Sequence, residues 1–224
     1  IGLVYKNMDN FEESEIYHQS AIEVFRELGI KSGLAGSLSN LANVFESQGK
    51  KEQALDLYQE ALSINQEIGN VRFIASDYSN LGILYKGQKD YSLALKYLDL
   101  SDSLYEEIED KTNLSLVLKE KAETLRFGAR DKGQVVPYSR ILALLRNSIM
   151  LAEESGSLAR QNTAWLALSD VFDEMGNISG AFNAFKRHVV FKDSIFNEEN
   201  RKKIVQQQAA FEYEKKEALL TTEY

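Results

Sequence analysis

The amino-acid sequence predicts an all-α protein, a right-handed α-solenoid in which antiparallel helix pairs follow one another along the chain. Residues 37–61 have the pattern of two short helices joined by a tight turn at Gly49-Lys50. One Pro and 13 Gly among 224 residues also suit a chain of helices with short turns. The pattern recurs with a period of 40 residues, which is the mark of a repeat architecture. The matching positions are Leu41 and Leu81, Phe45 and Tyr85, Ala54 and Ala94, and Leu55 and Leu95.

The order of small and bulky residues in each pair resembles the tetratricopeptide repeat. In that family the first helix carries a bulky residue, Leu, a small residue and an aromatic residue, and the second carries a small, an aromatic and another small residue. The family repeat has about 34 residues, so helices longer by about one turn are expected here. Gly29, Gly69 and Gly156 stand where such helices end. In the second repeat the family positions hold Leu38, Leu41, Ala42, Phe45, Ala54, Tyr58 and Ala61.

Five repeats are expected between residues 1 and 193, and the first is incomplete. The chain begins within a first helix, so we expect it to be a piece of a longer protein. In the fifth repeat Trp165 opens the pattern and should be largely buried. The expected segments are residues 1–7 and 11–28 for the first repeat, 31–69 for the second, 71–109 for the third, 112–127 and 138–154 for the fourth, and the residues up to 193 for the fifth.

The fourth repeat carries an insertion. The interval from Leu41 to Ala54 is 13 residues, whereas the equivalent interval from Lys121 to Ile141 is 20. Seven additional residues are therefore expected between its two helices, in a loop at about 128–137. Pro137 suits the start of the helix that follows, because first-turn amides lack helical partners.

Residues 194–224 are predicted to form a capping and connector helix. Ile195, Phe196 and Ile204 should pack on the fifth repeat, and the second half should project as a lever or meet a second subunit. The stretch 192–218 resembles the junction in bacterial tetratricopeptide sensor proteins. That resemblance implies an extracytoplasmic solenoid, a membrane anchor in the full-length protein, and a histidine kinase, cyclase or DNA-binding output domain. A cytoplasmic location is the alternative.

Charge and composition argue against several partners. A net charge of −8 is unsuited to nucleic acid and to anionic membranes, both of which attract basic surfaces. The absence of Cys excludes disulfides and thiolate chemistry. His18 and His188 both fall on repeat packing positions, so we interpret them as structural. No spacing of nucleophile, base and acid appears, so neither a catalytic site, a metal site nor a cofactor is expected.

The predicted binding surface is the concave groove that this family forms from its first helices. At about 100° per residue, one arc of each first helix faces away from Leu41 and its counterparts. Asn40 and Asn80 resemble the groove Asn with which longer-repeat members hold a peptide backbone. The fourth repeat makes the far half acidic and apolar, which suits an amphipathic segment with basic flanks. The predicted partner-binding residues are Asn40, Asn43, Asn80, Ile83, Leu116, Glu120, Glu123, Phe127 and Asp170.

Three functions follow in order of preference. The first is a peptide- or protein-sensing module of a bacterial signalling protein, with a histidine kinase as the preferred output domain. A cyclase or a DNA-binding transcription regulator is the alternative output. The second is a freestanding scaffold that joins a complex through its groove. An enzyme comes last.

Overall fold

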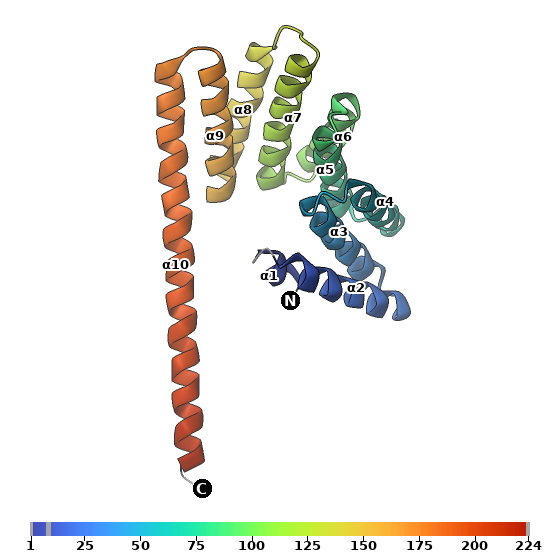
Figure 1. Cartoon of the computed structure of the whole chain (residues 1–224), viewed down its shortest axis with the longest axis vertical. Helices are drawn as coiled ribbons and strands as arrows, with labels where there is room; N and C mark the ends of the chain where they lie inside the picture. The colour runs from blue at the N-terminus through green and yellow to red at the C-terminus, as the bar shows by residue number, and fades with distance from the viewer. Residues whose placement is uncertain (1, 8–9, 223–224) are drawn as a thin grey trace. The chain divides into compact units, whose positions relative to one another are not determined.

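The computed structural model describes the backbone of residues 2–7 and 10–222, and the side chains of residues 2–4, 10–198 and 200–203. Within these residues the chain forms ten α-helices and no β-strand (Figure 1). This confirms the predicted all-α class and the antiparallel helix pairs. No helix in the described part is long and apolar enough to cross a membrane.

The ten helices form five pairs, one for each predicted repeat. Most of them have 17 or 18 residues, about one turn longer than a 34-residue repeat allows. The pairs are α1 (Gly2–Asn7) with α2 (Phe11–Glu27), α3 (Lys31–Ser47) with α4 (Lys51–Ile68), α5 (Val71–Gly87) with α6 (Tyr91–Glu107), α7 (Lys111–Asp131) with α8 (Tyr138–Glu154), and α9 (Leu158–Glu174) with α10 (Ile178–Thr222).

The chain divides into two compact units, residues 1–151 and residues 152–224. The first contains α1–α7 and most of α8, and the second contains α9 and α10. The predicted boundary at 193/194 lies inside α10, which continues without interruption from Ile178 to Thr222. The expected connector is therefore the continuation of the second helix of the fifth repeat.

Local chemistry places the helix ends. Asp90 caps α6 by accepting a hydrogen bond from the Leu93 N–H at 3.0 Å, and Asp110 caps α7 in the same way from Asn113 at 3.1 Å. Gly69 ends α4 in the left-handed conformation, with φ 69°. At the equivalent turn of the third repeat that conformation falls on Glu109, with φ 54°.

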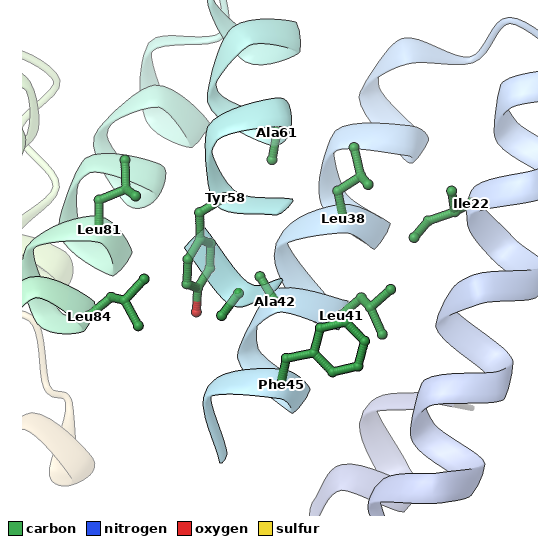
Figure 2. Packing of buried hydrophobic residues seen from close by; sticks show 10 residues of the cluster. Ile22, Leu38, Leu41, Ala42, Phe45, Tyr58, Ala61, Leu81 and Leu84 are labelled. Carbon is green, nitrogen blue, oxygen red and sulfur yellow. The ribbon is translucent and has the colours of Figure 1, made fainter. Parts of the chain in front are cut away.

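The core of the first unit consists of clusters of apolar side chains between successive helices. Tyr58 of α4 is fully buried and lies between Ala42 of α3 and the pair Leu81 and Leu84 of α5 (Figure 2). Within this core α4 is thus covered by α3, the first helix of its own repeat, and by α5, the first helix of the next repeat. Burial of one such large side chain contributes about 1.5–3 kcal/mol, so the stack stabilises itself repeat by repeat.

Two expectations of the sequence analysis differ from the structure. The insertion is not all loop, because α7 continues to Asp131 and buries Gly128. Gly128 lies against the Tyr91 ring, where an added Cβ would be 3.1 Å from the nearest ring carbon. Phe196, expected to pack on the fifth repeat, is exposed, whereas Trp165 has the intermediate exposure of a side chain that is mostly covered. The side chain of Ile204 lies outside the described residues.

Candidate functional site

The candidate site is the face of α3, α5 and α7 that points away from the Leu41 and Leu81 core, called here the A-helix surface. It contains two rows of three residues. In each row the second, third and fourth repeats contribute one residue each, at equivalent positions. Five of the six side chains are partly exposed, and Glu120 is buried. The first row is Asn40, Asn80 and Glu120, and the second is Asn43, Ile83 and Glu123.

Asn40 and Asn80 are the residues best placed to hold a ligand backbone. Neither side chain makes a hydrogen bond to another residue within the described part of the chain, and both are partly open to solvent. A carboxamide offers both a donor and an acceptor, so each can bind a peptide N–H and a peptide C=O together. The two predictions remain compatible with the structure.

Asn43 has a structural role instead. Its Nδ2 donates to the Ser39 carbonyl at 2.9 Å, and its Oδ1 accepts a hydrogen bond from the Tyr58 hydroxyl at 2.9 Å. Glu46 is a second acceptor for that hydroxyl, at 3.0 Å. Burial, and then Glu46, raise the pKa of Tyr58 well above its usual value, so the hydroxyl stays protonated. The predicted binding role of Asn43 is therefore not supported, because its polar atoms are already paired.

The expected acidic patch on α7 is neutralised by lysines. Lys86 of α5 contacts both Glu120 and Glu123, the latter at 2.6 Å. Lys119 lies 2.6 Å from Glu120 and 3.4 Å from Glu123. Two carboxylates and two ammonium groups thus form one mostly buried ion-pair cluster. The charges of Glu120 and Glu123 are thus balanced within the protein, and the preference for basic flanks stays a prediction.

The pKa values of the cluster agree with this pairing. Burial alone would raise the pKa of Glu120, but Lys119 and Lys86 hold it below its ordinary value. Burial alone would lower the pKa of Lys86, but Glu120 and Glu123 raise it. Glu120 and Lys86 are therefore both charged at neutral pH.

The remaining predicted residues lie apart from these two rows. Leu116 is partly exposed on α7, and Phe127 is partly exposed with the Arg126 guanidinium 4.7 Å from its ring centroid. Asp170 is exposed on α9, in the second unit. The two rows therefore contain six of the nine predicted residues, and Asp170 is described only within its own unit.

A buried polar cluster connects α3, α4 and α5. The Asp77 carboxylate accepts hydrogen bonds from Ser39 Oγ at 2.9 Å and Asn65 Nδ2 at 2.6 Å. Asp77 is 2% exposed, and burial raises its pKa to about 6 although both hydrogen bonds lower it. Asp77 can therefore change its protonation state near neutral pH.

The inserted segment forms the edge of a small pocket. Its volume is about 210 Å³, and its lining comes from α6, α7 and residues 132–137. Tyr91 lies at this pocket and donates a hydrogen bond from its hydroxyl to Asp131 at 2.6 Å. None of the predicted partner-binding residues lines it. The lining residues are Tyr91, Ser92, Leu95, Thr124, Leu125, Gly128, Ala129, Lys132, Gln134, Val135 and Pro137.

Lys86 and Lys119 are the residues of this surface that sequence reasoning missed. The spacing of Lys119 and Glu123 at i and i+4 was a local signal for an ion pair on one helix face. Lys86 carried no such signal, because its partners are 34 and 37 positions away. Among the described residues no group of three or more His, Cys, Asp or Glu side chains is placed to hold a metal ion.

Comparison with known proteins agrees with the helix pairs described above. Residues 1–67 match the family model of the tetratricopeptide repeat. The chain has a tetratricopeptide-repeat fold. No curated protein matches it.

Solved structures at low sequence identity share this tetratricopeptide-repeat fold. BtubC from P. vanneervenii has a TM-score of 0.68 at 16% identity, over 87% of this chain and 78% of that one. A Rap protein complexed with competence and sporulation factor has a TM-score of 0.61 at 15% identity, over 88% and 63%. A signal transduction ATPase with numerous domains and a tetratricopeptide repeat sensor, from Pyrococcus horikoshii, has a TM-score of 0.64 at 16% identity, over 86% and 29%.

Proposed function

We propose that this tetratricopeptide-repeat chain is a binding module that holds a peptide or protein segment along the A-helix surface. The observation that carries the proposal is the pair Asn40 and Asn80, equivalent residues of neighbouring repeats whose side-chain amides have no partner within the described chain. Their neighbours are either apolar, as Ile83 is, or already paired, as Glu120 and Glu123 are. A ligand would therefore be held mainly through its backbone.

Selection from a displayed library of random 12-residue peptides tests this proposal. Peptides enriched on the wild-type chain should bind an Asn40→Ala, Asn80→Ala double variant about 10- to 100-fold more weakly, because each lost hydrogen bond contributes about 1 kcal/mol. An Asn183→Ala, Asn197→Ala double variant is the matched control, since both residues are exposed on α10. Failure to enrich any peptide, or equal binding by both double variants, would contradict the proposal.

We further infer that the module is the sensor part of a bacterial signalling protein, with a histidine kinase as the preferred output. Support comes from the resemblance of residues 192–218 to sensor junctions and from the signal transduction ATPase with a tetratricopeptide repeat sensor that shares the fold. A freestanding scaffold is the alternative. Reading the gene beyond the codon for Tyr224 separates them: a membrane span followed by kinase motifs supports the sensor, and an early stop codon supports the scaffold.

We assign the chain a binding role and no reaction. His18 and His188 are its two histidines, and each occupies a packing position of a second helix. His188 contacts the Asn162 carbonyl through Nδ1 at 3.1 Å, and Asn162 Nδ2 donates to the His188 carbonyl at 3.1 Å. The ring is thereby engaged in joining α9 to α10.

A further inference from the structure

The second unit exposes an apolar helix face around a position that is buried elsewhere in the protein. Phe185 of α10 is equivalent to Tyr58 of α4 and Leu98 of α6. Tyr58 and Leu98 are 0% exposed, whereas Phe185 is 49% exposed. Phe182 and Ile178 continue the same face and are 68% and 80% exposed. We call Ile178, Phe182, Phe185 and Val189 the terminal face of α10.

The equivalent faces are covered by the first helix of the next repeat. Tyr58 packs on Leu81 and Leu84 of α5, and Leu98 packs on Val117 of α7. After α4 and α6 the chain turns within a few residues, and the covering helices α5 and α7 follow. α10 has 45 residues and continues to Thr222, so no turn brings a covering helix back onto the terminal face. The described chain therefore leaves open a surface shaped for a helix.

Charge indicates which helix would fit. Where α7 covers α6, its Lys121 lies 2.7 Å from Asp99 of α6 and also contacts Asp102. The position in α10 that corresponds to Asp99 is Lys186, which is exposed. The sign is thus reversed, and a helix that covers α10 as α7 covers α6 would need an acid in the place of Lys121.

We propose that the terminal face of α10 docks an amphipathic helix that carries an acidic residue opposite Lys186. Lys192 adds a second exposed base beside this face, and Asp193 is the one acid among residues 178–196. A second copy of α10 fits less well than an acidic helix, because it would bring Lys186 and Lys192 toward bases of the same kind. This surface is separate from the A-helix surface, so the inference is independent of the proposed function.

The chain supplies its own probe for this site. A labelled peptide of residues 111–131 reproduces α7, and a Lys121→Glu version provides the acid that Lys186 requires. In fluorescence anisotropy the Lys121→Glu peptide should bind the wild-type chain about two- to fivefold more tightly than the natural peptide, as expected for a partly exposed ion pair. A Lys186→Glu protein should reverse that order.

Two protein variants complete the test. Phe185→Ser should weaken both peptides at least tenfold, while circular dichroism shows an unchanged helix content because the side chain is half exposed in the native fold. Arg201→Glu makes the same charge change 15 residues beyond Lys186, about 22 Å along the helix, and should leave the peptide order as in the wild type.

The outcomes separate the occupants. Reversal of the peptide order by Lys186→Glu, together with the loss in Phe185→Ser, supports an acidic helix. If neither peptide binds, or if the order is the same in wild type and Lys186→Glu, the proposal is overturned. It is also overturned if sedimentation shows that the wild-type chain is a dimer that Phe185→Ser converts to a monomer, since the occupant is then a second copy.

Discussion

The Lys86 ammonium lies 2.6 Å from the Glu123 carboxylate and joins the third and fourth repeats across 37 positions of sequence. Lys86 also contacts Glu120, which Lys119 approaches from its own helix. A buried charge is tolerated only when it is paired, so these residues depend on one another. The cluster connects α5 to α7 on the surface where we place the ligand.

Lys86→Met should therefore destabilise the chain strongly. Glu120 would keep Lys119 but lose its contact to α5, and removal of one partner of a mostly buried pair is expected to cost about 2–4 kcal/mol at pH 7. Urea unfolding followed by circular dichroism measures this. The cost should shrink as the pH falls, because protonation of the carboxylates removes the charge that Lys86 balances. Glu123→Gln is the control and should cost about 1 kcal/mol or less, since Lys86 keeps Glu120. A change below 0.5 kcal/mol in Lys86→Met would contradict a stabilising cluster.

Asp77 should make stability fall as pH rises. Its pKa increases from 3.8 to about 6 on folding, so the folded chain binds the proton more tightly than the unfolded chain. The contribution is favourable below pH 3.8, declines between 3.8 and 6, and above 6 the ionised carboxylate carries its full cost. Asp77→Asn is always neutral. The difference in free energy of unfolding between Asp77→Asn and wild type should therefore increase in favour of the variant by about 2–3 kcal/mol between pH 4 and pH 7.5. Parallel stability curves for the two proteins would show that Asp77 does not titrate in this range.

Two glycine-to-alanine changes should have opposite signs. A Cβ on Gly82 would lie 2.7 Å from Leu98 Cγ, so Gly82→Ala must displace a buried side chain and should cost about 1–3 kcal/mol. Gly36 is also helical, but a Cβ there meets nothing within 4 Å. Gly36→Ala should therefore stabilise the chain by about 0.5–1 kcal/mol through helix propensity. Thermal unfolding of the two variants tests this difference in packing. Equal shifts of the melting temperature in Gly82→Ala and Gly36→Ala would contradict it.

Glu109→Gly should stabilise the turn between α6 and α7. Glu109 has φ 54°, a conformation that Gly adopts without strain, and it occupies the place that Gly69 takes one repeat earlier. The expected gain is about 0.5–1 kcal/mol. Glu106→Gly, the same substitution inside α6, should instead destabilise by up to about 1 kcal/mol. If Glu109→Gly lowers the melting temperature as much as Glu106→Gly does, the left-handed conformation carries no strain.

Most of the fold was predictable because its signals are local and repeated. Leu41, Ala42 and Phe45 recur at helical spacing, and the five helix pairs appear where that spacing places them. The end of α7 was missed, since Gly128 reads as a turn residue in sequence and its helical state depends on contact with Tyr91 of α6. Asn43 was assigned to the binding surface for a similar reason. Its hydrogen-bond donor, the Tyr58 hydroxyl, is 15 positions away in the sequence.

The sequence by itself determined the repeat, the helix pairs, the positions of Asn40 and Asn80 and the absence of any thiol chemistry. Those features follow from residue type and from periods of a few residues, which a single chain displays directly. Only the tertiary structure decided that Glu120 and Glu123 are neutralised, that Asp77 is buried with a raised pKa, and that Phe185 stays exposed where Tyr58 and Leu98 are covered. Ionisation and exposure depend on which residues of the next helix come within a few ångströms, and that distance is set by packing between repeats.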